Sequence, residues 1–453
     1  MKDVGGLKQI LRYLLKLNRS VLISLTFASI IAAGTLLLML PVANTGGKWL
    51  APLDALFMST SAACVSGMAV LDIGRDFTVF GQIVVLLLFQ VGALGVMTLT
   101  SLITVGAKKR ISMRQRLLMQ EAMNQNAPGN VVNMALKIIK ITLLVEFISG
   151  ALLSCYFYPD AGLKGIYYGY YHAISAFCNA GFDVLGHGNS LAVTKTNIFV
   201  NVIIMALIVA GSIGFPVLRD IWRNTKWNKF SLHTKLTLTV NAVLIAGGCI
   251  LIWLLEKGNT ATLGLLGTGD QFLVALFQSV TLRTAGFTTM DIASARNATL
   301  FLMMIFMFIG ASSASMGGGI KTSTFAVLVA STMSLLRGRK DVVLFKRRIG
   351  QDLVAKSTSI FVLAVLYTCA AFFLLLALDD RNQPFMHVAF EIFATVGTTG
   401  IGIGITEEWN NWCRLVMIVS MFVGRIGILT FSLSFIDKKS DALRYPSENI
   451  LIG

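Results

Sequence analysis

The sequence contains little charge. Only 13% of its 453 residues are Asp, Glu, Lys or Arg, about half the fraction of an average soluble domain. Hydrophobic residues make up 55% of the chain, and the mean hydropathy is +0.74. Such a chain has too few charged side chains to cover a surface of this size in water. The sequence therefore excludes a soluble globular protein and predicts a polytopic membrane protein.

Side chains suited to covalent or metal chemistry are also scarce. The six cysteines have no paired or metal-like spacing, which excludes a disulfide framework and predicts reduced, structural thiols. His172 and His387 lack a second ligand at metal spacing, and no orienting acid accompanies a Ser66–His172 pair. The sequence therefore predicts that the protein is not an enzyme.

The net charge of +16 is not spread like that of a nucleic-acid-binding protein. The basic residues cluster between apolar segments and follow every second one, at 108–116, 219–229, 337–348 and 437–439, and they also fill the N-terminal segment. The alternate loops have more acidic residues. By the positive-inside rule, this pattern predicts a multi-pass protein of the cell membrane with both termini in the cytoplasm. Membrane lipid is the expected surrounding, and no nucleic-acid partner is expected.

Long apolar stretches are what the sequence has in abundance. A bilayer core needs about 20 apolar residues per helix, so the pattern predicts eight spans. The first is too long for the apolar region of a signal peptide, and we expect it to be retained. The approximate limits of the eight are 21–42, 79–106, 137–158, 196–218, 235–255, 299–336, 357–378 and 411–436.

The outer loops repeat one pattern. Each contains a short amphipathic run followed by a turn of small residues anchored on Gly67, Gly181, Gly286 or Gly400. An aromatic residue lies nine or ten positions before each glycine, and a bulky apolar residue follows it. The repetition predicts four copies of helix, re-entrant run and helix, of which only the third has a broken second helix. Each second span also carries a glycine, at Gly92, Gly211, Gly310 and Gly424.

The predicted fold is all-α, with eight transmembrane helices in four helix–pore loop–helix repeats around one pseudo-fourfold pore. The third repeat contains the broken second helix. The segments are a cytoplasmic N-terminal segment (1–20), pore repeats 1 to 4 (21–117, 118–228, 229–350 and 351–436) and a cytoplasmic tail (437–453).

The four turns have the chemistry of a cation filter. Non-helical backbone at membrane depth persists only where protein or a water-filled cavity covers it. Glycine allows a loop to turn its carbonyl groups toward an axis, and rings of carbonyls replace the hydration shell of a dehydrated cation. One such turn alone is more typical of helix packing, so the prediction depends on the fourfold repetition. None of the predicted filter residues is a carboxylate: Val65, Ser66, Gly67, Asn179, Ala180, Gly181, Thr284, Ala285, Gly286, Thr398, Thr399 and Gly400.

Several further motifs stand out along the chain: "HAISAFCNAGF" (172–182), "FSLHTKL" (230–236), "RTAGF" (283–287), "GASSASMGGGIKTSTF" (310–325), "MFVGRIGILTF" (421–431) and "RYP" (444–446). Together they resemble the Ktr/Trk/HKT superfamily of potassium transporters, most closely its KtrB-type subunit. The resemblance covers essentially the whole chain. It implies potassium uptake through the filter residues with sodium as a further candidate ion, a homodimer, and a cytosolic regulatory ring through which a nucleotide acts.

The small residues from Gly310 to Gly319 interrupt the sixth span. A segment without bulky side chains can move without leaving large cavities, and the resemblance implies that it is an intramembrane gate. A plain packing kink is one alternative. A phosphate-binding loop is another, although Ile320 separates glycine from lysine and no strand precedes the loop. The predicted gate residues are Gly310, Ala311, Ser312, Ser313, Ala314, Ser315, Met316, Gly317, Gly318, Gly319, Lys321 and Arg425.

Arg425 lies within the eighth span with no carboxylate near it in that span. A charge at the bilayer centre costs about 2.5–3.5 kcal/mol, so we expect Arg425 to donate to carbonyls or hydroxyls of the gate loop and to repel cations in the pore. A snorkelling arginine near a helix end is the alternative. Glu146 in the third span and Lys321 have no predicted partner.

A secondary transporter with broken helices is the alternative from another functional class. It would bind sodium or an organic solute at the bilayer midplane. That class usually has inverted repeats and carboxylates facing a central cavity, whereas the four repeats predicted here share one orientation.

Overall fold

The structure, a computed structural model, describes residues 19–95, 131–186, 191–339 and 341–433. These residues are mostly helical, with one two-stranded hairpin among them. The basic loop 108–116 and the C-terminal tail lie outside the described residues, as does nearly all of the predicted N-terminal segment.

Four described helices are long and apolar enough to cross a membrane. They are α2 (Arg19–Met39), α8 (Val131–Ala161), α12 (Leu232–Glu256) and α16 (Gln351–Leu378). Large apolar side chains on their outer faces are 63–69% exposed, which suits contact with lipid and not with water. Examples are Leu36, Phe147, Val243 and Phe373.

A shorter helix packs against each long one. These helices are α3 (Pro52–Ala63) on α2, α9 (Leu163–Cys178) on α8, α13 (Thr268–Thr281) on α12 and α17 (Phe385–Val396) on α16. The aromatic residue that the sequence repeats before each anchor glycine is fully buried in all four helices, so it fills the core each time. These residues are Phe57, Tyr171, Phe277 and Phe390.

A second helix follows each short one and ends at a glycine with positive φ. These helices are α5 (Val79–Leu94), α10 (Ile198–Ile213), α14 (Asn297–Ile309) and α18 (Asn411–Ile426). The chain continues as α11 (Phe215–Arg223), α15 (Thr322–Leu336) and α19 (Ile428–Leu433) after the last three. The terminating glycines are Gly95, Gly214, Gly310 and Gly427, with φ between 66° and 97°.

The broken helices correct one expectation and leave another only partly met. The prediction that only the third copy is broken is wrong, because α10 and α18 also end at glycines, and α10 meets α11 at an angle of 100°. Of the eight predicted spans, four described helices qualify by length and composition, or five if α10 and α11 form one bent span. The others are shorter because a glycine at positive φ ends each of them.

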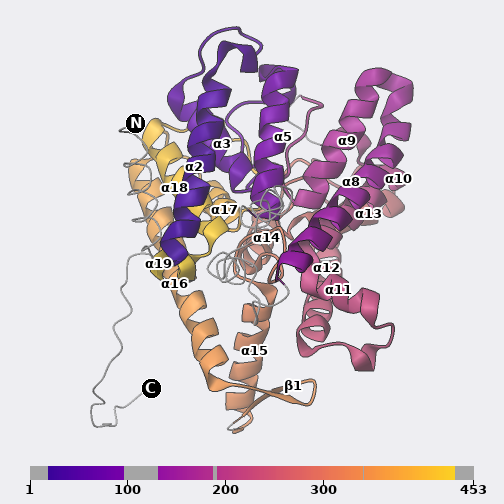
Figure 1. Cartoon of the computed structure of the whole chain (residues 1–453), viewed down its shortest axis with the longest axis vertical. Coiled ribbons are helices and arrows are strands. Elements are labelled where there is room, and N and C mark those ends of the chain that lie inside the picture. The colour runs from indigo at the N-terminus through magenta and orange to yellow at the C-terminus, as the bar shows by residue number, and fades with distance from the viewer. Residues whose placement is uncertain (1–18, 96–130, 187–190, 340, 434–453) are drawn as a thin grey trace, which may run out of the picture.

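Figure 1 shows α14 in the middle of the molecule, between one group formed by α2, α3 and α16–α18 and another formed by α8–α10, α12 and α13. At one end, α15 and α16 run side by side and are joined by strands β1 (Val342–Leu344) and β2 (Arg347–Ile349). The strands are antiparallel, with Val342 opposite Ile349. Short helical turns complete the fold: η1 (Pro41–Ala43), α4 (Ile73–Asp76), η2 (Ala192–Thr194), η3 (Trp227–Lys229) and η4 (Thr406–Glu408).

A buried carboxylate fixes the start of the central helix α14. Glu256, at the end of α12, is fully buried. It accepts hydrogen bonds from the backbone N–H of Arg296 (2.9 Å) and the hydroxyl of Thr299, both at the first turn of α14. It also accepts from the Asn259 amide (2.7 Å) and the Thr262 hydroxyl (2.6 Å). A negative charge at a helix N-terminus is favourable, so Glu256 ties α12 to α14.

We predict that Glu256→Ala lowers the melting temperature of the detergent-solubilised protein by about 5 °C, because four donors lose a charged acceptor. Glu407→Ala, at an exposed acid of an outer loop, serves as the control and is expected to leave the melting temperature unchanged. Equal melting temperatures for the two variants would contradict the anchoring role of Glu256.

Candidate functional site

The four predicted filter segments share one unusual backbone conformation. Each short helix leads into a non-glycine residue at positive φ, and a glycine with φ between 71° and 82° follows two positions later. Three of the non-glycine residues are β-branched, for which positive φ is a genuine outlier. Strain of this kind persists only where the surroundings impose it, and it concentrates at functional sites. The four residues are Val65 (55°), Asn179 (57°), Thr284 (69°) and Thr398 (50°).

The glycines of the four segments form a closed ring. A Cβ atom added to Gly67 would lie 2.6 Å from the carbonyl oxygen of Ala180, and one on Gly181 would lie 2.7 Å from that of Ala285. A Cβ on Gly286 would lie 2.9 Å from the carbonyl oxygen of Thr399. One on Gly400 would overlap the carbonyl oxygen of Ser66, which returns to the first segment. Each glycine therefore contacts the carbonyl just before the next glycine of the ring, and none has room for a side chain.

The ring gathers polar oxygens that lack protein partners. The side-chain oxygens of Ser66, Asn179, Thr284, Thr398 and Thr399 are buried and accept no hydrogen bond from the described residues. An unsatisfied buried oxygen is costly unless water or a cation meets it. The short helices also direct their carboxyl ends, which carry partial negative charge, toward the ring. The twelve predicted filter residues thus lie together in surroundings that suit a dehydrated cation.

A second set of glycines lets the following helices approach the ring. A Cβ atom on Gly92, Gly211 or Gly424 would overlap a carbonyl oxygen at or near the end of the neighbouring short helix, on Ala63, Phe177 or Val396. Each of these carbonyls lies four residues before a ring glycine. These three glycines are therefore points of close backbone contact, and the next glycine, three residues on, ends each helix; in the third copy Gly310 itself ends α14.

The predicted gate loop is bonded to the break between α10 and α11. The backbone N–H groups of Ser312 and Met316 donate to the carbonyls of Ser212 and Gly211 at the end of α10, both at 3.1 Å. The N–H of Phe215, at the start of α11, donates to the carbonyl of Ala314 (3.1 Å). Helix ends leave such groups without intrahelical partners. The gate loop and the break therefore complete each other's backbone hydrogen bonds.

Side chains of the loop are bonded in the same way. The Asn241 amide on α12 donates to the hydroxyl of Ser312 (2.9 Å). The Ser313 hydroxyl lies 2.7 Å from that of Ser323, and Ser315 donates to the carbonyl of Ser312 (2.6 Å). The serines thus satisfy groups that the missing helical turn leaves open.

The far end of the loop lies directly against the ring. A Cβ atom on Gly317 would overlap the hydroxyl of Thr284, and one on Gly318 would overlap that of Thr398. Only glycine allows the loop to come this close to two filter threonines. The small residues of this segment therefore allow its close contact with the ring.

Arg425 and Lys321 hold the loop through its carbonyl groups. Arg425 donates to the carbonyl of Met316, as the sequence predicts, and also to Gly92 and Ala93 at the end of α5. Lys321 donates to the carbonyls of Gly317 (2.6 Å) and Gly318 (3.4 Å). Lys321 thus bonds the loop's own backbone, and residues 310–321 lie between two helices with no strand before them. This geometry does not favour a phosphate-binding loop.

A cavity of about 380 Å³ lies beside the loop. Its lining includes Ser315, Lys321, Lys356 and Arg425 together with apolar residues of several helices. The three basic residues make this side of the loop electropositive, in contrast to the oxygen-rich ring on its other side.

Glu146 has a polar partner and no basic one within the described part of the chain. The Gln90 amide donates to both of its carboxylate oxygens at 3.0 Å, and the thiol of Cys178 donates to the Gln90 side-chain oxygen. All six cysteines are free. No group of three metal-ligating side chains occurs among the described residues.

Two features of the site were missed in the sequence. Arg283 is fully buried beside the third filter segment and donates to backbone carbonyls of α14 and the gate loop. An arginine directly before a filter triplet was a visible signal for it. The breaks at Gly214 and Gly427 also had a signal, because each follows another glycine by three residues.

The apolar helices and the buried ring of non-helical backbone define a multi-pass membrane protein with a cation-compatible site. The same fold occurs in the crystal structure of the potassium transporter TrkH from Vibrio parahaemolyticus, which is 18% identical and superimposes with a TM-score of 0.73 over 92% of this chain and 85% of that one. A family model described as TrkH, cation transport protein, matches residues 17–444. The chain therefore belongs to the TrkH family of cation transport proteins, which confirms the resemblance seen in its motifs.

Curated relatives match nearly the full length. Ktr system potassium uptake protein B of Bacillus subtilis is 39% identical over 432 residues, covering 95% of this chain and 96% of the relative. Potassium/sodium uptake protein NtpJ of Enterococcus hirae is 36% identical over 440 residues, covering 95% and 96%.

We predict that Gly211→Ala lowers the melting temperature by about 5 °C or prevents folding, because its methyl group would overlap the Phe177 carbonyl. Gly247→Ala is the matched control: it also lies within a helix, α12, but a Cβ atom there meets nothing within 4 Å. The control is expected to be neutral or slightly stabilising, since alanine favours the helix. If both variants melt like the wild type, the close contact is not required.

Proposed function

We propose that this protein is the ion-translocating subunit of a Ktr-type potassium uptake system. The observation that carries the proposal is the closed ring, in which each of four glycines contacts the carbonyl preceding the next. Carbonyl oxygens with no carboxylate among them suit a monovalent cation that has lost its water. The names of the relatives, potassium uptake proteins, support potassium as the ion. The name of the Enterococcus relative, a potassium/sodium uptake protein, supports sodium as a second ion.

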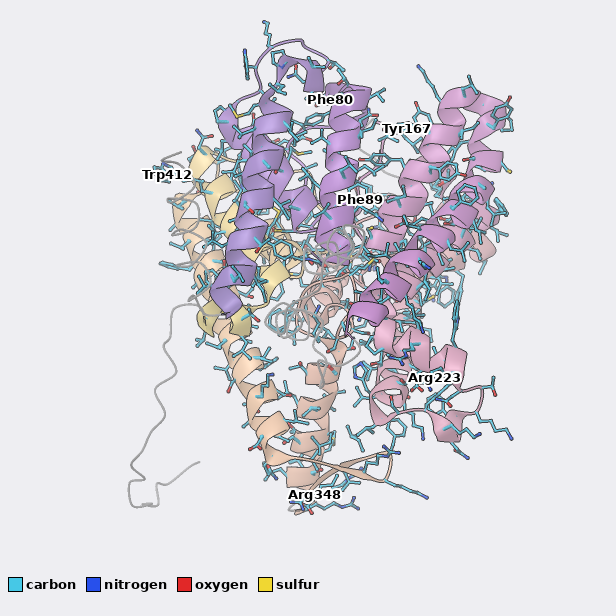
Figure 2. The ribbon with its side chains drawn as sticks, in the orientation of Figure 1. Phe80, Phe89, Tyr167, Arg223, Arg348 and Trp412 are labelled. Carbon is cyan, nitrogen blue, oxygen red and sulfur yellow. The ribbon has the colours of Figure 1, made fainter. Side chains whose placement is uncertain are left out.

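The proposed architecture is eight membrane helices in four repeats, at 21–117, 118–228, 229–350 and 351–436, with the ring on a common axis. The end of the molecule that carries Arg223 and Arg348 is taken as cytoplasmic by the positive-inside rule; Figure 2 shows both far from Phe80 and Trp412. Both termini would then be cytoplasmic. The Ktr-system names support a partner subunit. We propose that a homodimer docks a cytosolic nucleotide-binding ring at this end.

The loop from Gly310 to Gly319 is the proposed gate. It lies against Thr284 and Thr398 on one side and the basic cavity on the other, so it would block a pore that passes through the ring. Arg425 would keep it there through the Met316 carbonyl. Its charge, together with that of Lys321, would repel cations until the loop moves.

Growth tests the proposal directly. A bacterium without its own potassium uptake systems should grow at low external potassium when it expresses this protein, and grow better with a co-expressed Ktr regulatory subunit. Failure of the correctly inserted protein to restore growth or potassium uptake under either condition would reject the function. Uptake of an organic solute instead would favour a secondary transporter.

We predict that Gly67→Ser reduces discrimination of potassium from sodium by about tenfold. At a φ of 77°, with the Ala180 carbonyl in the way, a side chain must displace the ring. Gly269→Ser, at an exposed site on α13 with open space around it, is the control. Competitive uptake of labelled ions measures the ratio, and an unchanged ratio in a normally expressed Gly67→Ser protein would remove this glycine from the filter.

We predict that deleting residues 312–318 raises cation flux and weakens its dependence on the regulatory subunit. Arg425→Ala should act in the same direction, because it releases the Met316 carbonyl. The two changes together should add little, since both remove one barrier. A role of the loop as a gate alone leaves discrimination between potassium and sodium unchanged, because neither change removes a filter residue. Lost or unaltered flux in a deletion variant that reaches the membrane intact would make the loop a structural kink.

A further inference from the structure

Arg283 is a buried cation next to the filter. Its side chain is fully buried, and no described carboxylate pairs with it. Its guanidinium group donates to the carbonyls of Phe306 (3.3 Å) and Gly310 (3.5 Å) and lies 5.6 Å from the centre of the Phe306 ring. Its Nε has no partner among the described residues. Burying a charge with so few compensating contacts is costly, so a neutral residue would stabilise this position better.

The partners of the guanidinium group belong to the start of the gate. Phe306 lies in the last turn of α14, and Gly310 is the first residue of the loop, with a φ of 66°. The Phe306 carbonyl also accepts a hydrogen bond from the backbone N–H of Gly310 (3.3 Å), and carbonyls at a helix carboxyl end carry partial negative charge. Arg283 therefore holds the point at which the chain leaves α14 and enters the gate loop.

The backbone of the same residue belongs to the filter. Arg283 directly precedes Thr284, whose φ of 69° begins the third filter segment. Its carbonyl accepts a hydrogen bond from the Asn179 amide (3.0 Å), and Asn179 begins the second filter segment. Arg283 thus links the second and third filter segments through its backbone. Its side chain links the third segment to Gly310, the first residue of the gate loop, which is called the Gly310 hinge below.

Arg425 holds the gate loop at a different place from Arg283. It binds the Met316 carbonyl, six residues further along the loop, and its other partners are at the end of α5. Among the described residues it makes no hydrogen bond to a filter residue. The loop is thus held at two places by two arginines, the fully buried Arg283 and the partly buried Arg425, and only Arg283 directly adjoins a filter segment.

We propose that Arg283 is a positioning residue that couples the gate to the filter, so that movement of the Gly310 hinge alters the carbonyl ring and its discrimination between cations. The inference rests on the proposed function. A residue that only caps α14 would affect stability and leave ion discrimination untouched.

The test compares purified wild-type protein with Arg283→Gln and Arg283→Lys in liposomes, by competitive uptake of potassium and sodium. Coupling predicts that Arg283→Gln raises flux and lowers the potassium-to-sodium ratio by about tenfold, while Arg283→Lys, which keeps the cation, retains most of the ratio. Arg425→Ala should raise flux at an unchanged ratio. Arg296→Gln, at the exposed, opposite end of α14, should change neither quantity.

A second variant covers the case in which Arg283→Gln does not fold. Gly310→Ala changes the hinge, because alanine is unfavourable at this φ, and it leaves every filter residue intact. Coupling predicts a reduced ratio for this variant too. If both variants fold and neither changes the potassium-to-sodium ratio, the inference is overturned. It is also overturned if Arg283→Gln does not fold and Gly310→Ala changes the flux but not the ratio. Either result would leave the proposed function standing. Absence of any cation flux in the wild type would overturn both.

Discussion

The structure depends on one constraint: a backbone group buried away from water must find a partner in the protein. Residues 310–321 leave the helical path in the middle of the molecule, and α10 is interrupted beside them at Gly214. Each segment alone would expose unpaired N–H and carbonyl groups. Together they pair Ser312 and Met316 with the end of α10, and Ala314 with the start of α11. The helix break in the second copy is therefore a structural complement to the loop in the third.

The same constraint explains three cations around the loop, of which Arg283 is fully buried and Lys321 and Arg425 are partly buried. Arg283, Lys321 and Arg425 make no hydrogen bond to a described carboxylate; the described acceptors of all three are backbone carbonyls at helix ends or within the gate loop. Carbonyls at a helix carboxyl end carry partial negative charge. The same hydrogen bonds thus satisfy carbonyls of helix ends and of the gate loop and place three positive charges close to the ring. A carboxylate partner would have neutralised that charge.

Features that recur in all four copies could be predicted from the sequence, whereas features that depend on a single copy were missed more often. The ring residues could be predicted because four equivalent turns share an anchor glycine and an aromatic residue that the core buries, such as Phe57 and Phe277. The Arg425 contact could be predicted because a charge in an apolar span requires acceptors. The break at Gly214 was missed because its cause is bonding to a loop about 100 residues away, and its local signal, a glycine three residues after Gly211, is ambiguous. Arg283 was missed because it looked like part of a motif, and its role depends on where α14 ends.

The spans were also harder to predict than the ring. Hydropathy counts apolar residues along the chain and does not detect that a glycine at positive φ ends α5 or α14 before a bilayer has been crossed. The second of each glycine pair, such as Gly95 after Gly92, carries this information, but a glycine in an apolar run is equally compatible with helix packing.

Because all four segments of the ring belong to one polypeptide, each can differ from the others. The residue at positive φ that begins each segment of the ring is Val65 in the first copy, Asn179 in the second and threonine in the other two. Among the described residues, a ten-residue loop follows the second helix of the third copy, whereas a single glycine separates the two helices in the second and fourth copies. Four identical subunits would have to carry four such loops or none, all crowded onto the same axis. Covalent linkage of unequal copies is thus what allows a nearly symmetric ring to lie against a single loop that only one copy supplies.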